Sequence, residues 1–309
     1  MPGTRRPHHA LLTLAAVLAG GAAVVGATVL TSGAPERPDE PLATTAGLER
    51  LHRLPPVTDK VFTWDTAQAR SAAAQRQYAI DCMARKGFRY APKATAPAGA
   101  GEDARPRTFG LETPPSTTIP APPEAEEAPP KPGSPEASPA FGKALFGDEA
   151  KRVTVKGKAG MSVSRPGNGC LADAETRMLG DGRARWLQVQ IELFEGQEQA
   201  RAEVEKDPAF QSATGRWRQC MERAGFPAQR DPQALLRTLP NQKARLKGRD
   251  ILKSDLRCKS ETGYLTVAYT RLAAVQERWL DRNPVVTKDW TSLLARQDKA
   301  AREVLAAKS

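Results

Sequence analysis

Apolar residues recur every three or four positions over most of the chain after residue 64, which is the spacing of amphipathic helices. The clearest stretch begins at Asp207, an N-cap residue followed by proline, and ends at Gly225. Its apolar face carries Phe210, Ala213, Trp217, Cys220, Met221 and Ala224. An earlier stretch runs from about Asp65 to Lys86 and stops at Gly87. Both predicted helices therefore end at a glycine suited to a left-handed cap.

Further helices are predicted after Cys170, each from one stripe of apolar positions. The stripes run from Trp186 to Val204, from Leu265 to Trp279 and from Trp290 to Leu305, and a polar sequence before Pro284 separates the last two. Aromatic residues in such stripes belong to a hydrophobic core far more often than to a ligand site. We expect a bundle of about five to seven helices, small enough to need covalent support.

Period-two alternation replaces the helical spacing in only one place. Val153 and Val155 precede a GKAG turn, and Met161 and Val163 follow it, which predicts a short β-hairpin. Residues 91–140 hold 13 of the chain's 26 prolines, a composition typical of a disordered arm. The predicted fold class is therefore mainly α: a disulfide-stapled helical bundle of duplicated helix units, with a short β-hairpin and a disordered Pro-rich insert. Deleting 91–140 should leave helicity and melting temperature nearly unchanged.

The N-terminus has the layout of an export signal. Two arginines at positions 5 and 6 precede an uncharged run from Ala10 to Leu30, and a polar, proline-bearing sequence follows. The run is long enough to cross a bilayer, so an uncleaved single-pass anchor competes with a signal cleaved near Ala27. No cysteine directly follows the run, which excludes lipid attachment there. The expected location is the cell membrane with an extracytoplasmic C-terminal domain, or alternatively secretion.

The predicted domain organisation follows from these segments. Residues 1–34 form the export signal or membrane anchor, and 35–60 a linker. Residues 61–309 form an extracytoplasmic helical domain, which the disordered insert at 91–140 interrupts.

Four cysteines in an exported chain are expected to form disulfides. Cys82 and Cys220 open the related heptapeptides CMARKGF and CMERAGF, whereas Cys170 and Cys258 each precede an acidic residue at the third following position. The separations Cys82 to Cys170 and Cys220 to Cys258 differ by the length of the Pro-rich insert, so removing the insert makes the two spacings coincide. We favour these two pairs within a duplicated unit, although four cysteines allow two other pairings.

The chain resembles a group of uncharacterised exported actinobacterial proteins, secreted or lipoprotein-like, over roughly Asp65 to the C-terminus. The resemblance rests on CMARKGF, CMERAGF, GCLADAE and SDLRC, and more weakly on RTFGL near Phe109 and KALFG near Phe146. It implies an envelope location and a variable insert, and it implies no known activity.

Histidine-dependent chemistry is not expected in the folded region. His8 and His9 lie in the export signal and His52 just beyond the predicted membrane segment, so Ser-His-Asp and Cys-His catalysis and most zinc sites are excluded. We predict no catalytic residue, no metal and no cofactor. A hydrolase that uses paired carboxylates remains the alternative, with candidates among the polar positions of the helices. These candidates are Asp173, Glu192, Glu195 and Glu198.

Positive charge is concentrated in the second half of the chain. Residues 141–309 carry 31 Lys and Arg against 21 Asp and Glu, while the whole chain has a net charge of +11. Two basic runs are candidate polyanion-binding sites. They contain Lys151, Arg152, Lys156, Lys158, Lys243, Arg245, Lys247, Arg249, Lys253 and Arg257. Nucleic acid is not an expected partner, because aromatic residues do not interleave with the basic ones and the location is outside the cytoplasm.

The sequence therefore predicts a non-enzymatic, membrane-tethered extracytoplasmic module, with the membrane contact through Ala10 to Leu30. Its partner is expected to be a cell-envelope protein or an anionic polymer of the cell wall or membrane, such as a teichoic-acid-type polymer. A carboxylate-dependent cell-wall hydrolase is the alternative.

Overall fold

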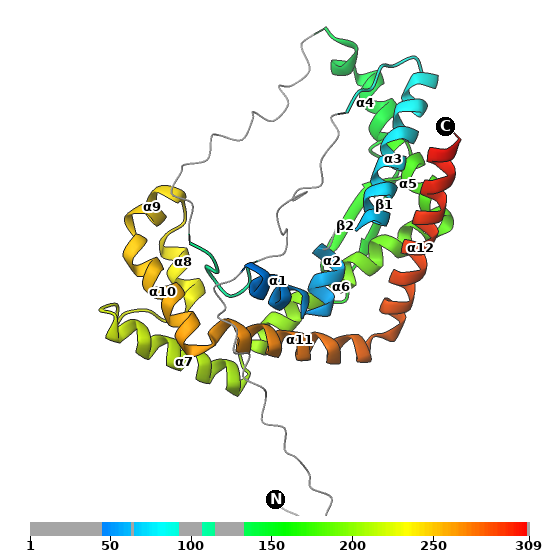
Figure 1. Cartoon of the computed structure of the whole chain (residues 1–309). Helices are drawn as coiled ribbons and strands as arrows, with labels where there is room; N and C mark the ends of the chain where they lie inside the picture. Colours follow the sequence, from blue (N-terminus) through cyan, green and yellow to red (C-terminus); the bar gives the residue numbers. More distant parts are fainter. Residues whose placement is uncertain (1–44, 63–64, 93–106, 115–132, 308–309) are drawn as a thin grey trace, which may run out of the picture. The chain divides into compact units, whose positions relative to one another are not determined.

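The computed structural model is mainly helical and contains a single described β-hairpin, which confirms the predicted fold class (Figure 1). It describes residues 45–62, 65–92, 107–114 and 133–307. All of these belong to one unit, Glu40–Ser309. The elements are α1 (Thr45–Arg53), α2 (Pro56–Phe62), α3 (Thr66–Arg85), α4 (Pro139–Phe146), β1 (Arg152–Lys156), β2 (Ser162–Pro166), α5 (Cys170–Leu179), α6 (Arg183–Val204), α7 (Pro208–Arg223), α8 (Pro232–Thr238), α9 (Gln242–Lys247), α10 (Arg249–Thr262), α11 (Tyr264–Arg282) and α12 (Pro284–Ala306).

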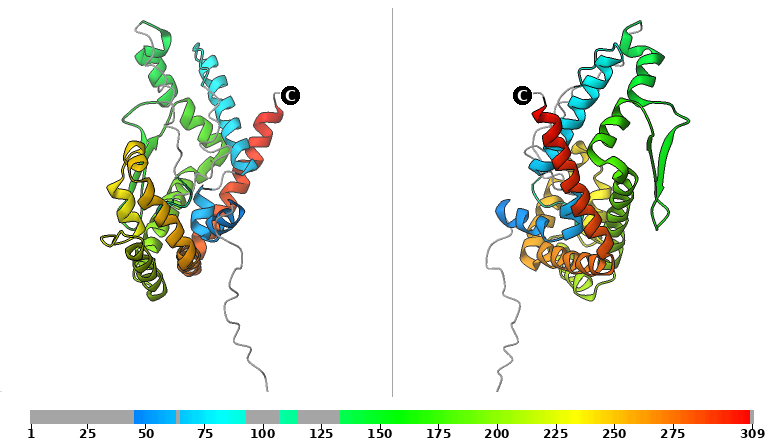
Figure 2. Two further views of the ribbon diagram at one scale, coloured as in Figure 1. Left: turned by 60° about the vertical axis from the view of Figure 1, so that its left-hand side comes forward. Right: turned by 90° about the vertical axis from the view of Figure 1, so that its right-hand side faces the viewer.

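The helices pack as two neighbouring groups. Helices α3, α5 and α12 lie side by side, and α7 and α10 pack on each other and on α11 (Figures 1 and 2). Helix α6 packs on α11 and also on α12. The largest hydrophobic cluster lies in the second group, around Trp217 and Tyr264, which are 0% and 1% exposed. Burying such large rings supplies much of the hydrophobic free energy of the group.

The predicted helix starts are confirmed in atomic detail. The Asp207 side chain accepts hydrogen bonds from the backbone N–H groups of Ala209 at 2.9 Å and Phe210 at 3.1 Å, and so caps α7. Asp65 and Gln68 form a reciprocal capping box at the start of α3. Each cap satisfies backbone donors that the helix itself leaves without a partner.

The two related heptapeptides close their helices by the same hydrogen bonds. Phe88 N–H donates to Met83 O at 3.0 Å, and Phe226 N–H donates to Met221 O at 2.9 Å. The glycine before each phenylalanine is left-handed, with φ of +81° at position 87 and +89° at position 225. This is the Schellman pattern expected from the sequence, and each phenylalanine packs against the hydrophobic cluster of its own methionine.

The hairpin was predicted at the right place. Strands β1 and β2 pair antiparallel with Val155 opposite Val163. Val153 and Val155 are half-buried and alternate with exposed residues along the whole of β1, as the period-two pattern requires. On β2 the same alternation holds around Val163 and ends at Arg165, which is exposed. The hairpin packs on α6 and α5.

Two expectations about the connecting segments need correction. The predicted linker at 35–60 is folded where it is described, because α1 and α2 bury Leu48, Leu51 and Val57. The amide oxygen of Gln276 on α11 accepts hydrogen bonds from the N–H groups of Val57 at 2.8 Å and Thr58 at 3.1 Å, which fixes α2.

The Pro-rich insert also contains ordered segments. Residues 107–114, which we call the inner segment, place Phe109 in the largest hydrophobic cluster at 3% exposed, and Pro139 begins α4. Deleting the whole of 91–140 would therefore remove part of the core. The disorder predicted for residues 93–106 and 115–132 of the insert falls outside the described residues.

The predicted membrane segment, Ala10 to Leu30, also lies outside the described residues. Within the part of the chain that the structure describes, no helix combines the length and the apolar character needed to cross a membrane.

Candidate functional site

Both favoured disulfides are present, Cys82–Cys170 and Cys220–Cys258, and the Cα atoms are 5.6 Å apart in each. The first joins the end of α3 to the first residue of α5, and the second joins the end of α7 to the middle of α10. No cysteine is free. Each bond therefore fixes one of the two glycine-terminated helices to a second helix, as the spacing predicted.

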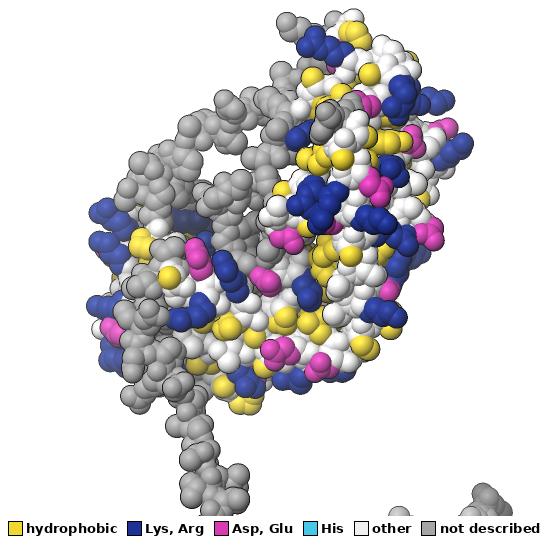
Figure 3. Space-filling model, turned by 45° about the vertical axis from the view of Figure 1, so that its right-hand side comes forward, with side chains coloured by type: hydrophobic (Ala, Val, Ile, Leu, Met, Phe, Trp, Pro, Cys, Tyr) yellow, Lys and Arg dark blue, Asp and Glu magenta, His cyan; other side chains and the backbone are white. Residues whose placement is uncertain are grey.

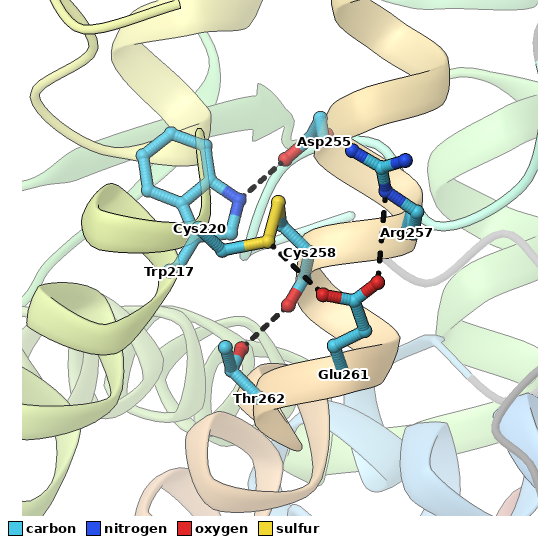
Figure 4. Close-up of a disulfide and its surroundings, with 7 residues drawn as sticks. All are labelled: Trp217, Cys220, Asp255, Arg257, Cys258, Glu261 and Thr262. Atoms are coloured by element: carbon cyan, nitrogen blue, oxygen red, sulfur yellow. Dashed lines mark hydrogen bonds and ion pairs between the residues drawn. A yellow bond between two sulfur atoms is a disulfide. The ribbon is translucent and has the colours of Figure 1, made fainter. Parts of the chain in front are cut away.

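A carboxylate lies beside one sulfur of each disulfide. Glu261 Oε2 is 3.3 Å from Cys220 Sγ (Figure 4), and Asp173 Oδ2 is 3.9 Å from Cys82 Sγ. Both acidic residues stand three positions after the partner cysteine, so one helical turn brings them back over the bond. A disulfide sulfur carries no hydrogen, so the carboxylate adds a negative charge beside the bond without receiving a proton from it.

The basic residues of the hairpin lie on its exposed side. Arg152 and Lys156 lie on the same exposed face of β1, with Thr154 between them. Lys151 and Lys158 flank the strand and are also exposed. Arg152 donates from Nε to Ser164 Oγ at 2.8 Å and from a terminal nitrogen to Ser164 O at 3.0 Å. The guanidinium is thus held against the neighbouring strand by two hydrogen bonds.

The second basic run forms α9 and α10. Arg249, Lys253 and Arg257 are spaced by four residues, so they lie one above another on the exposed side of α10, and we call them the α10 ridge. Arg257 pairs with Glu261 at 3.6 Å. Arg245 is half-buried and donates to Leu239 O, Lys247 is exposed, and the side chain of Lys243 lies outside the described atoms.

The structure does not join the two basic runs into one site. The hairpin packs on α5 and α6, whereas α10 packs on α7, α9 and α11. On the face shown in Figure 3, Lys and Arg side chains alternate with acidic and hydrophobic ones, so positive charge does not form a continuous patch there.

Three of the four candidate hydrolase carboxylates do come together. Glu192, Glu195 and Glu198 line one pocket of about 890 Å³ between the hairpin, α6 and the end of α11, and we call it the hairpin pocket. Trp279 lines it too. The fourth candidate, Asp173, lies instead beside the Cys82–Cys170 disulfide.

Each carboxylate of the hairpin pocket already has partners. Glu192 accepts from Arg185 at 3.2 Å and from Gln188 at 3.1 Å. Glu195 accepts from the backbone N–H groups of the hairpin turn at residues 159 and 161, and Glu198 pairs with Arg201. These contacts hold all three carboxylates in fixed positions at the pocket.

The sequence missed a buried polar network around the inner segment. The expectation that the folded region has no histidine is wrong, because His52 is 4% exposed and its Nε2 lies 2.5 Å from Glu112 Oε2. The Tyr269 hydroxyl donates to the other oxygen of Glu112, and Arg107 donates at 3.0 Å. Burial acts to raise the pKa of Glu112, but the hydrogen bonds and the positive charge around it outweigh burial and lower that pKa.

A second buried pair holds the same segment. Lys259 donates to Asp255 Oδ2 at 2.9 Å and to Leu111 O at 2.5 Å, and Trp217 Nε1 donates to Asp255 Oδ1 at 3.0 Å. Burial lowers the pKa of Lys259 and raises the pKa of Asp255, because removal from water disfavours both charges. Asp255 and Lys259 are 0% and 1% exposed, so this pair anchors the inner segment from within the core.

Across the described ranges, no set of three or more His, Cys, Asp or Glu is placed to hold a metal ion.

The fold and these contacts define a disulfide-stapled, mainly helical protein with exposed basic helices. The chain matches no protein-family model, no curated protein and no solved structure.

Proposed function

We propose that this chain is a non-enzymatic, membrane-tethered extracytoplasmic module that binds an anionic polymer of the cell envelope through the α10 ridge. The observation that carries the proposal is the ridge itself: three exposed cations on successive turns of one helix, of which Arg257 alone has an acidic partner among the described residues. A row of cations spaced by about 6 Å suits a chain of repeating negative charges better than it suits a compact ligand.

The cross-linked framework supports this use of the ridge. Helix α10 is tied to α7 by the Cys220–Cys258 bond, and Cys258 lies on the buried side of the helix that carries the ridge. The three cations are therefore presented on a rigid support, which lowers the entropy lost when a polymer binds. Disulfides are compatible with the oxidising environment outside the cytoplasm.

The test is co-sedimentation of the full-length chain with purified cell walls, before and after chemical removal of their phosphate-rich polymers. The ridge variant Arg249→Gln/Lys253→Gln/Arg257→Gln should lose most of the binding, and binding should weaken steeply as salt rises. The matched control Lys151→Gln/Arg152→Gln/Lys156→Gln removes the same charge from the hairpin and should retain it. Equal loss in both variants, or unchanged binding to stripped walls, would contradict the proposal.

A carboxylate-dependent wall hydrolase is the second candidate, and the hairpin pocket favours it because three glutamates share that pocket with Trp279. Release of soluble fragments from peptidoglycan by the full-length chain, abolished in Glu192→Gln or Glu195→Gln, would support it. Binding of walls without any release would favour the non-enzymatic module.

A further inference from the structure

A second pocket, of about 480 Å³, lies among α6, α7, α8 and the start of α11, with the inner segment on one side. No α10 residue lines it, so it is separate from the α10 ridge. Its volume falls within the range of pockets that hold small molecules. We call it the arginine pocket, because four arginines line it, from three parts of the chain: Arg201, Arg218, Arg230 and Arg237.

Positive charge exceeds negative charge in this pocket. Two carboxylates, Glu205 and Asp231, also line it. Asp231 is engaged at the start of α8, where it accepts from Ala234 N–H at 2.6 Å and from Arg230 Nε at 2.9 Å. Four guanidinium groups against two carboxylates leave a net charge of about +2 facing the pocket.

Two of the arginines are uncommitted. Arg201 pairs with Glu198 and Arg230 pairs with Asp231. Among the described residues, Arg218 on α7 and Arg237 on α8 make neither an ion pair nor a hydrogen bond, and both line the same pocket. Guanidinium groups present paired donors that match a phosphate or carboxylate oxygen pair, so two free ones suit a doubly charged anion.

The inner wall of the pocket is aromatic. The rings of Phe109 and Phe210 are 5.6 Å apart, and the rings of Phe210 and Tyr264 are also 5.6 Å apart. Burial raises the pKa of Tyr264, so its phenol stays neutral and adds no negative charge. A ring or polyol carbon skeleton can pack against such faces while its charged group meets the arginines.

We propose that the arginine pocket binds a small phosphate ester with a ring or polyol moiety, such as a sugar phosphate, with Arg218 and Arg237 on the phosphate and Phe210 against the carbon skeleton. This site goes beyond polymer binding by the α10 ridge, since each involves different helices. The inner segment forms part of the wall through Phe109, so a ligand bound here also contacts the insert.

The experiment is calorimetric titration of the full-length chain with glucose 1-phosphate, inorganic phosphate and citrate. Glucose 1-phosphate should bind, and Arg218→Gln and Arg237→Gln should each weaken it by about tenfold, as expected for loss of a hydrogen bond to a charged group. Arg249→Gln, on the α10 ridge, is the matched control and should leave the affinity unchanged. Phe210→Leu should weaken the binding of glucose 1-phosphate but leave the binding of inorganic phosphate unchanged.

Three results would overturn the inference: no heat of binding from a folded chain at millimolar glucose 1-phosphate, tighter binding of citrate than of either phosphate, or a loss confined to Arg249→Gln. The two proposals can fail independently. If the ridge variant loses cell-wall binding but still binds glucose 1-phosphate, the arginine pocket is a separate site from the α10 ridge.

Discussion

Glu261 Oε2 lies 3.3 Å from Cys220 Sγ, and the Arg257 guanidinium lies 3.6 Å from the other oxygen of the same carboxylate (Figure 4). Reduction of a disulfide begins with the attack of an anionic thiolate on sulfur. A fixed carboxylate beside that sulfur repels the attacking thiolate, and Arg257 offsets only part of the repulsion. The corresponding contact of Asp173 with Cys82 places a like charge at the other disulfide.

The first prediction follows from this pair of contacts. Glu261→Gln should speed reduction of Cys220–Cys258 by a thiol reagent about two- to fivefold at low ionic strength, because about 1 kcal/mol of repulsion is removed at this distance in water. The rate is measured by alkylation and mass spectrometry, bond by bond. Asp173→Asn is the reciprocal control and should accelerate only Cys82–Cys170. Equal acceleration of both bonds by either variant would point to general destabilisation instead.

The second prediction concerns Gly110 in the inner segment. Its φ is +92°, and an added Cβ would lie 2.9 Å from Pro232 Cβ and 3.0 Å from Lys259 Nζ. Gly110→Ala should therefore lower the free energy of unfolding by about 2 kcal/mol or more, through backbone strain and a steric clash. Gly133→Ala is the control, because Gly133 has a φ of +86° and open space around it. Similar losses in both variants, measured by urea unfolding, would show that the inner segment is not closely packed.

The third prediction concerns the buried Lys259–Asp255 pair. Lys259→Met leaves the Asp255 carboxylate buried without its counter-charge and should cost about 3–5 kcal/mol. The double variant Asp255→Asn/Lys259→Met removes both charges and keeps an acceptor for Trp217, so it should lose less than the sum of the single variants. Lys253→Met, on the exposed side of the same helix, should change stability by no more than about 0.5 kcal/mol. Additive losses would show that the two charges are not coupled.

The fourth prediction is a pH dependence that arises from Glu112. Its pKa is lower in the folded chain than the ordinary value of 4.5, so its contribution to stability is fully present above that value and is lost as the pH falls through the folded pKa. Urea unfolding at a series of pH values should show a stability gap between the native chain and Glu112→Gln that narrows on acidification below about pH 4.5. Glu136→Gln changes an exposed carboxylate and should produce no such narrowing.

The features that sequence predicted well are those set by neighbours in the chain. The Asp207 cap of α7, the left-handed glycines and the β-hairpin each depend on residues close together in the sequence. The disulfide pairing joins residues that are distant in the sequence. It could be predicted only because the two related heptapeptides could be compared with each other.

The inner segment escaped prediction because its partners are distant in sequence. Glu112 is 60 residues from His52 and 157 from Tyr269, and Leu111 is 148 residues from Lys259. A composition dominated by proline masks the few positions of the insert that become buried, such as Phe109 in RTFGL. The arginine pocket was missed for the same reason, since its four arginines come from α6, α7 and the segment 230–237, and they belong to neither basic run.

The inner segment is a shared contact of four helices. His52 on α1, Gln233 on α8, Lys259 on α10 and Tyr269 on α11 each form a hydrogen bond with a residue of 107–114. A change of length within these eight positions would therefore disturb all four helices together, although α1 and α11 lie far apart in the sequence.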